Sequence, residues 1–232
     1  MSKIVIFSGA GISAESGIST FRDSDGLWEK YDIKDICTVG CLDTNREETL
    51  EFYNQRRDDI KDKNPNIAHE IISKLKNQYP DKIAVITQNV DNMFERAGCI
   101  DVLHLHGYLR EIRCMKCNFV KDIAYEKQNE DELCPTCKGK LRPNIVFFGE
   151  PAPMYELLYK ELEDCEVFVC IGTSGAVINV DMLSQWGEYK ILNNLEESNL
   201  INAEYFNEVY YENATTALPK IELSLAKFLE DC

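Results

Sequence analysis

The sequence predicts an α/β fold, in which a doubly wound, mostly parallel sheet carries a smaller second domain. Three observations predict this class. Short apolar runs alternate with helical patterns, small or polar residues follow almost every run, and two cysteine pairs lie in a stretch that is poor in apolar residues. With 232 residues, of which 44% are apolar, the chain can supply a core for such a fold.

Six apolar runs are expected to form the strands, because parallel strands that are covered on both faces read as continuous apolar segments. These runs are Lys3–Phe7, Lys82–Thr87, Val102–His106, Asn144–Phe148, Val167–Ile171 and Lys190–Leu195. The carboxyl ends of strands in an open α/β sheet form its ligand crevice. The small and polar residues that follow these runs are therefore expected to line a binding site.

Four segments carry helix signals. Asn64-Pro65 supplies an N-cap and a first-turn proline for a helix that ends before Pro80. The segment 44–47 has a capping-box pattern that opens a helix to about Ile60. Met154–Leu162 and Pro219–Leu229 are the other two predicted helices.

Two stretches interrupt the alternation of strands and helices and predict the smaller domain. One runs from about Asp23 to Asn64 and is too long for an ordinary crossover, and the other is Arg113–Leu141. We expect the large domain to comprise residues 1–30, 81–112 and 142–232, and the small domain to comprise residues 31–80 and 113–141.

Composition excludes several classes of protein. Asp and Glu number 40 against 25 Lys and Arg, and the net charge of −15 argues against binding a nucleic-acid backbone over a broad surface. No apolar run reaches the roughly 20 residues of a membrane span. Because the first strand follows Met1 almost directly, we expect no secretory leader, a cytoplasmic location and reduced thiols.

The two cysteine pairs predict a metal site. Two C-x2-C turns separated by sixteen residues can direct four thiolates at one tetrahedral zinc ion. Four thiolates leave no open coordination position, so the zinc is expected to be structural. The predicted ligands are Cys114, Cys117, Cys134 and Cys137. The other cysteines show no ligand spacing and are expected to be small core or surface residues.

A glycine turn follows the first predicted strand. Gly9, Gly11 and Ala14 form a G-x-G-x-x-A pattern, which permits a tight turn and close approach to a pyrophosphate, although an ordinary strand–helix turn is an equal alternative. The acid that usually ends a second strand about 20 residues later is missing. The pattern therefore argues against a simple dehydrogenase.

Of the three histidines, His104 and His106 are candidates for general-base chemistry, although a structural role is the default interpretation for either. His69 lies in the polar part of a predicted helix and is expected at the surface. His104 and His106 both lie on the run that leads to Gly107, and the pattern alone does not choose between them.

At this point the motifs together resemble those of the sirtuins, over nearly the whole chain and in the expected order. The segments that carry the resemblance are 9–18, 20–22, 87–91, 106–107, the double cysteine pair, 147–150, 172–174 and 194–196. The resemblance implies NAD-dependent removal of acyl groups from protein lysines. It also implies a Rossmann-like large domain and a small domain made of a zinc ribbon and a helical module, with catalysis in the cleft between them.

The resemblance also implies residue roles. NAD is consumed as a co-substrate, His106 is the base because it directly precedes Gly107, and Asn89 assists catalysis. The base acts on a ribose hydroxyl, and the products are nicotinamide, free lysine and O-acyl-ADP-ribose. The implied cofactor contacts are Gly9, Ala10, Gly11, Ile12, Ala14, Glu15, Phe21, Arg22, Trp28, Gln88, Asn89, Val90, Asp91, Gly172, Thr173, Ser174, Asn194, Leu195, Glu196 and Ala214. The implied peptide contacts are Val146, Phe147, Phe148 and Gly149, with the peptide held as an added strand.

Two residues of the helix after Thr44 bear on the acyl group. Tyr53 and Arg56 stand at i and i+3 and resemble the pair of the sirtuin branch, found in bacteria and mitochondria, that removes succinyl and malonyl groups. A guanidinium fork and a phenol suit a terminal carboxylate. That branch has an alanine where this chain has Cys37, so a slightly narrower pocket is expected. The expected activity is dual, with a preference for acidic acyl groups.

Two alternatives remain open at this stage. One is an NAD-dependent protein ADP-ribosyltransferase that uses the same cleft, and the other is a non-catalytic zinc-ribbon binding module. The expected partners are proteins or peptides with acylated lysines, without nucleic acid or membrane, and a monomer is expected.

Overall fold

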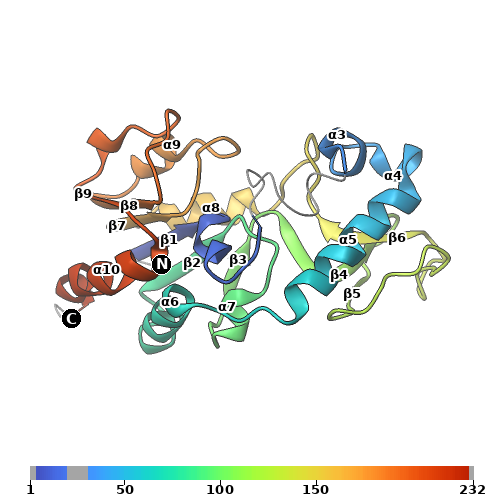
Figure 1. Cartoon of the computed structure of the whole chain (residues 1–232), viewed down its shortest axis with the longest axis horizontal. Helices are drawn as coiled ribbons and strands as arrows, with labels where there is room; N and C mark the ends of the chain where they lie inside the picture. Colours follow the sequence, from blue (N-terminus) through green and yellow to red (C-terminus); the bar gives the residue numbers. More distant parts are fainter. Residues whose placement is uncertain (1–3, 20–30, 230–232) are drawn as a thin grey trace.

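The computed structural model describes residues 4–19 and 31–229. Its larger sheet has six strands, all parallel, in the order β3-β2-β1-β7-β8-β9 (Figure 1). The strands are β1 (Ile4–Ser8), β2 (Ile83–Thr87), β3 (Val102–His104), β7 (Val167–Ile171), β8 (Tyr189–Asn194) and β9 (Glu208–Tyr211). The predicted doubly wound parallel sheet is therefore confirmed.

The order of these strands creates a switch point between β1 and β7. The chain passes from β1 outward to β2 and β3, and then starts again on the other side of β1 with β7, β8 and β9. Ser8 is in register with Thr87 on β2 and with Ile171 on β7, so the carboxyl ends of the three central strands lie at one edge. Ligands of open α/β sheets bind at such a point.

A second, antiparallel sheet has three strands in the order β5-β4-β6. They are β4 (Gly107–Cys114), β5 (Val120–Asp122) and β6 (Leu141–Ile145). The prediction that Asn144–Phe148 forms a strand of the large sheet is therefore wrong. An apolar run reports burial and not the sheet to which it belongs, and Pro143 on β6 fits an edge strand, which needs fewer backbone donors. The half-buried edge strand β9 gave no strong apolar run and was not predicted.

Helices cover both faces of the large sheet. On one face α6 (Ile67–Gln78) and α10 (Ala214–Leu229) pack over β1, β2 and β7, and on the other lie α8 (Tyr155–Leu162) and α9 (Val180–Ser184) (Figure 1). Asn66 is the N-cap of α6, so the predicted cap at Asn64-Pro65 is wrong by two residues. Helix α10 begins five residues before Pro219, where the sequence predicted its start. The short helices α1 (Gly11–Ala14) and α7 (Met93–Arg96) follow β1 and β2.

The antiparallel sheet packs against the helices α3 (Ile33–Ile36), α4 (Cys41–Thr44) and α5 (Arg46–Lys61). Arg57 fixes α5 to β4, because its buried Nε donates to the carbonyl of Leu109 at 2.7 Å. The predicted capping box is wrong: Thr44 closes α4, and Asn45 makes no side-chain cap for α5. A single 3-10 turn, η1 (Ala203–Tyr205), precedes β9.

The predicted boundary of the small domain at residue 80 stays a prediction. Residues 31–80 include α6, whose apolar side chains belong to the same core as those of β1, β2 and α10. This packing favours a boundary before Ile67. Within the described ranges, no helix is long and apolar enough to cross a membrane.

Candidate functional site

Two glycine turns meet at the switch point of the large sheet. A Cβ atom on Gly11 would lie 2.7 Å from the Cα of Gly172, and one on Gly172 would lie 2.5 Å from the backbone nitrogen of Ile12. Gly172 also has a φ of +62°, a conformation that side chains disfavour. Glycine is required here because the turns after β1 and β7 pack backbone to backbone. Ala10, Gly11 and Gly172 are half-buried and lie at the edge where a nucleotide would bind.

Polar side chains join the ends of the three central strands. The hydroxyl of Ser8 donates to that of Thr87 at 3.0 Å, and the amide of Gln88 donates to the hydroxyl of Thr173 at 2.9 Å. These bonds link β1 to β2 and β2 to the turn after β7. The predicted cofactor residues Gln88 and Thr173 are therefore brought together.

Ser13 is the centre of a buried polar network beside this edge. Its hydroxyl donates to the Asp91 carboxylate at 3.0 Å and accepts from the Asn89 amide at 3.1 Å. Asp91 also accepts from the backbone amide of Met93 at 3.0 Å. Burial raises the pKa of Asp91, although these donors act to lower it. Asn89 and Asp91, both predicted site residues, are thus fixed by Ser13, a residue not among the predicted contacts.

His69 belongs to the same network, and its expected place at the surface is wrong. The imidazole is fully buried, its Nδ1 accepts from the Asn66 backbone amide at 3.3 Å, and its Nε2 lies 3.4 Å from the Ser13 hydroxyl. Its Nδ1 also lies 3.1 Å from the side-chain oxygen of Asn66, so both ring nitrogens have polar partners. Burial lowers the pKa of His69 to about 3, so the ring is neutral.

The environments of His104 and His106 distinguish the two rings. The Nδ1 of His104 faces the carbonyl of Asn89 at 2.9 Å, and its Nε2 faces the Glu95 carboxylate at 2.8 Å. Both partners only accept hydrogen bonds, so both nitrogens carry hydrogens and the ring is an imidazolium. Burial acts to lower the pKa of His104, but the carboxylate of Glu95 raises it overall. His104 therefore offers no lone pair to a substrate.

His106 is neutral and has one basic nitrogen. Its Nδ1 lies 3.0 Å from the carbonyl of Gln88 and must donate to it, which leaves the lone pair on Nε2. Burial lowers the pKa of His106, and the bond to Gln88 acts in the opposite direction. The hydroxyl of Tyr155, at the start of α8, lies 3.1 Å from that Nε2. Tyr155 was not predicted, because no sequence signal connects α8 with the histidine.

Gly107 sets the path of the chain beyond the base. It has a φ of +90°, and a Cβ atom there would lie 2.0 Å from the carbonyl oxygen of Asn144 on β6. The backbone amide of Val146, the residue after β6, donates to the carbonyl of His106 at 2.9 Å. The base is thereby tied to the segment predicted to contact the peptide.

The predicted acyl pocket lies on α5. Tyr53 is buried, its ring stacks on that of Phe147 with centroids 5.7 Å apart, and its hydroxyl lies 3.4 Å from the Cys37 sulfur. Burial, followed by the neighbouring Cys37, raises the pKa of Tyr53, while the charge of Arg56 acts to lower it. Burial lowers the pKa of Arg56, while Tyr53, Cys37 and Asp91 act to raise it. The three residues that bear on the acyl group therefore lie together, next to the polar network.

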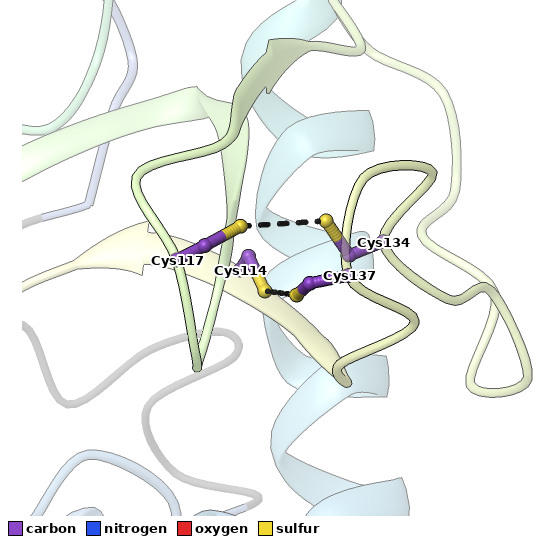
Figure 2. Close-up of side chains that lie close together, drawn as sticks. All are labelled: Cys114, Cys117, Cys134 and Cys137. Atoms are coloured by element: carbon purple, nitrogen blue, oxygen red, sulfur yellow. Dashed lines mark hydrogen bonds between the residues drawn. The ribbon is translucent and has the colours of Figure 1, made fainter.

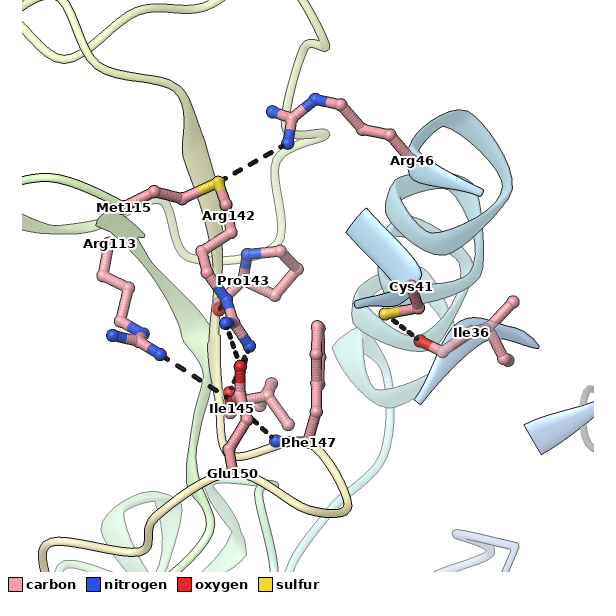
Figure 3. A network of polar contacts seen from close by, with 10 residues as sticks. All are labelled: Ile36, Cys41, Arg46, Arg113, Met115, Arg142, Pro143, Ile145, Phe147 and Glu150. Atoms are coloured by element: carbon pink, nitrogen blue, oxygen red, sulfur yellow. Dashed lines mark hydrogen bonds and ion pairs between the residues drawn. The ribbon is translucent and has the colours of Figure 1, made fainter. Parts of the chain in front are cut away.

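A partly buried ion pair fixes the predicted peptide segment. Arg142 on β6 binds both carboxylate oxygens of Glu150, at 2.5 and 3.0 Å, and its guanidinium lies 4.0 Å from the ring centroid of Phe147 (Figure 3). Glu150 also accepts from the Phe147 backbone amide at 2.9 Å. Arg142 lowers the pKa of Glu150 against the opposing effect of burial. Phe148 beside them is exposed, and its amide donates to the carbonyl of Cys37 at 2.8 Å.

The remaining predicted cofactor residues are less closely grouped. Asn194 and Ala214 are buried, whereas Leu195 and Glu196 are exposed at the end of β8. Glu15 accepts from the amide and hydroxyl of Thr215, at 3.0 and 2.7 Å, and so joins the segment after α1 to the first turn of α10. Phe21, Arg22 and Trp28 lie outside the described residues.

The four predicted metal ligands gather beside the antiparallel sheet. Their sulfur atoms all lie within 4.8 Å of one another, with Cys114 3.4 Å from Cys137 and Cys117 3.7 Å from Cys134 (Figure 2). A tetrahedral zinc ion with bonds of about 2.3 Å separates its sulfurs by a little under 4 Å. The cluster therefore fits one zinc ion. Cys41, Cys99, Cys165 and Cys170 are buried core residues, as expected.

Comparison with known proteins gives a consistent result. The model of the Sir2 family matches residues 9–179. The NAD-dependent protein deacylase of Campylobacter jejuni subsp. jejuni serotype O:2 is 47% identical over 233 residues, covering 100% of this chain and 99% of the relative. That of Escherichia coli K12 is 37% identical, covering 98% of this chain and 84% of the relative.

Solved structures agree with these relatives. A mutant Sir2 homologue in complex with ADP-ribose superposes with a TM-score of 0.86 at 31% identity, over 99% of this chain and 94% of that one. A Sir2 homologue–NAD complex superposes with a TM-score of 0.84 at 31% identity, over 98% and 90%.

Proposed function

The chain belongs to the Sir2 family and is an NAD-dependent protein deacylase, and we propose that His106 is its general base and that Tyr53 and Arg56 favour acyl groups ending in a carboxylate. The observation that carries the first assignment is the hydrogen bonding of the two neighbouring rings. Both nitrogens of His104 face acceptors, whereas the Nε2 of His106 retains a lone pair. A general base needs that lone pair.

The proposed NAD site is the switch point between β1 and β7. The tight turns at Gly11 and Gly172 would let the pyrophosphate approach closely, and Gln88, Asn89 and Asp91 would hold the ribose and nicotinamide. The bound dinucleotide supplies an activated ribose carbon whose leaving group is nicotinamide. Ser13 keeps Asn89 and Asp91 in place, because it bonds to both side chains.

His106 would hold the proton of a ribose hydroxyl on Nε2. Its Nδ1–H donates to the Gln88 carbonyl, which fixes both the tautomer and the orientation of the ring. Burial keeps the pKa of His106 below its usual value, so the ring is in its basic form at neutral pH. The proposed products are nicotinamide, free lysine and O-acyl-ADP-ribose.

The proposed peptide site adjoins Val146–Gly149. The exposed Phe148 already pairs with the segment after α3, since its amide donates to Cys37 and its carbonyl accepts from Val39 at 2.8 Å. The ion pair between Arg142 and Glu150 fixes the end of this segment to β6. A lysine from a peptide added here would extend its acyl group toward α5 and the ring of Tyr53, which stacks on Phe147.

A preference for acidic acyl groups follows from the residues at the end of that path. The phenol of Tyr53 and the guanidinium of Arg56 are suitable donors for a carboxylate. The Cys37 sulfur lies against the Tyr53 hydroxyl and takes up space that an alanine would leave. We therefore propose that succinyl and malonyl groups are removed faster than acetyl groups.

The proposed zinc ion is structural. The four cysteine sulfurs would complete its coordination, and the site lies on the antiparallel sheet, away from His106. The finer expectations of a monomer and a cytoplasmic location stay predictions. The net charge of −15 supports the expectation that nucleic acid is not a partner.

The base assignment is tested with His106→Ala. A peptide with one succinyl-lysine is incubated with NAD⁺, and mass spectrometry follows the peptide and O-acyl-ADP-ribose. We expect product formation to fall at least 100-fold, the lower range of general-base contributions, while zinc content and circular dichroism stay unchanged. Wild-type rates in the variant would refute the role of His106, and a modified protein acceptor would indicate a transferase instead.

The acyl assignment is tested with Arg56→Met, which retains length and removes the charge. The ratio of succinyl to acetyl removal is the readout, because it cancels any loss of folded protein. We expect this ratio to fall at least tenfold, since a charged hydrogen bond is worth about 1.5–3 kcal/mol. Cys37→Ala is the matched control in the same pocket and keeps the ratio above one. An unchanged ratio in Arg56→Met would refute the assignment.

A further inference from the structure

The base nitrogen of His106 already has a hydrogen-bond partner in this structure. The Tyr155 hydroxyl lies 3.1 Å from Nε2, and the two ring centroids are 6.1 Å apart. Tyr155 comes from α8, which follows the proposed peptide segment, and it has no part in the chemistry proposed above. The Tyr155 hydroxyl therefore either positions the base or competes with the substrate for the Nε2 lone pair.

The protonation states of the two groups decide which of them donates the hydrogen bond. The Gln88 carbonyl can only accept, so Nδ1 of His106 carries the hydrogen of the neutral ring and Nε2 is bare. Burial raises the pKa of Tyr155, with a smaller contribution from Tyr159, so the phenol keeps its proton at neutral pH. Tyr155 is therefore the donor, and its hydroxyl occupies the one lone pair of the base.

We propose that Tyr155 is a gating residue, whose hydroxyl occupies the Nε2 lone pair of His106 until a ribose hydroxyl binds there and displaces it. The inference rests on the proposed role of His106. An in-plane imidazole lone pair accepts one hydrogen bond, so the Tyr155 hydroxyl and the ribose hydroxyl cannot both donate to Nε2. Binding of the dinucleotide must therefore displace the phenol.

The placement of Tyr155 allows this displacement without unfolding α8. The helix is anchored by Leu158 and Leu162, which are buried in the core of the large sheet. Tyr155 is half-buried in the first turn, and the N-cap residue Met154 makes no side-chain cap. Rotation of the Tyr155 side chain therefore breaks its bond to His106 and leaves the two leucines in place.

The test measures the affinity for ADP-ribose, which carries the ribose hydroxyls and has no nicotinamide to lose. Calorimetry is performed on the wild-type protein and on Tyr155→Phe, which retains the ring and removes the donor. We expect ADP-ribose to bind about two- to tenfold more tightly to the variant, the factor that corresponds to one neutral hydrogen bond.

Tyr159→Phe is the matched control. Tyr159 lies one turn further along α8 and is 44% exposed. The substitution removes the same hydroxyl group, and we expect the Tyr159→Phe protein to bind ADP-ribose as tightly as the wild type. Unchanged or weaker binding by Tyr155→Phe would overturn the inference. A large fall in kcat with unchanged affinity would also overturn it and would make Tyr155 a proton relay. No binding of ADP-ribose by the wild-type protein would instead refute the proposed function itself.

Discussion

The buried neutral imidazole of His69 predicts a specific dependence of stability on pH. His69 has no exposed surface, and burial lowers its pKa to about 3, compared with about 6.5 in the unfolded chain. Between these values the unfolded chain binds a proton that the folded protein does not. The unfolding free energy is therefore highest where both rings are neutral, well above pH 6.5. It falls as the pH decreases through 6.5 toward 3.

The magnitude follows from the two pKa values. Between pH 7 and pH 5 the folded ring stays neutral while the unfolded one becomes protonated, which lowers the unfolding free energy by about 2 kcal/mol. The figure depends almost entirely on the unfolded pKa, because pH 5 lies well above the folded one. His69→Gln retains a polar side chain that does not titrate, so this contribution disappears in the variant.

Urea unfolding at pH 7 and pH 5, followed by circular dichroism, measures the effect. The quantity of interest is the loss of unfolding free energy between the two pH values, which we expect to be about 2 kcal/mol smaller in His69→Gln than in the wild type. Taking this difference cancels groups that titrate in both proteins, including the cysteine ligands. Equal losses in the two proteins would show that the reasoning about His69 is wrong.

Three further predictions concern the ion pair, the turn after the base and the zinc site. Arg142→Met leaves the Glu150 carboxylate without its bidentate partner and is expected to lower the unfolding free energy by about 3 kcal/mol in urea; a loss below about 1 kcal/mol would contradict this. Gly107→Ala is expected to lower both the melting temperature and kcat, whereas Gly98→Ala, with a similar φ of +82° and open space around it, affects the melting temperature alone; equal effects on kcat would contradict the clash with Asn144. Removal of zinc by a chelator is expected to abolish amide-exchange protection in β5 and retain it in β1, and protection unchanged in β5 would exclude a structural metal.

The parts of the structure that could be predicted from sequence depend on local patterns. Continuous apolar runs identified five strands of the large sheet, because burial on both faces makes a strand apolar throughout. The two C-x2-C turns identified the metal cluster, since each turn brings its own two sulfurs together. The sheet to which β6 belongs depends on its partner strand, and no residue of Leu141–Ile145 encodes that partner.

The roles of the histidines depend on residues distant in sequence. His104 is distinguished from His106 by Glu95 and by the Gln88 carbonyl, which occupy their positions only in the folded chain. His69 was assigned to the surface because it lies in the polar part of the predicted helix. Its burial results from the bonds to Asn66 and Ser13. Tyr155 offered no local signal at all.

The central claim is that this chain removes acidic acyl groups from lysine at the cost of NAD⁺, with Tyr53 and Arg56 as the selecting residues. It is tested most directly by one peptide sequence that carries either acetyl-lysine or succinyl-lysine, mixed in equal amounts and incubated with the wild-type protein, with and without NAD⁺. Mass spectrometry is expected to show NAD⁺-dependent loss of succinyl faster than acetyl, with O-acyl-ADP-ribose formed in equal amount. Loss of acetyl alone would contradict the role of Tyr53 and Arg56, and no NAD⁺-dependent loss of either group would contradict the whole account.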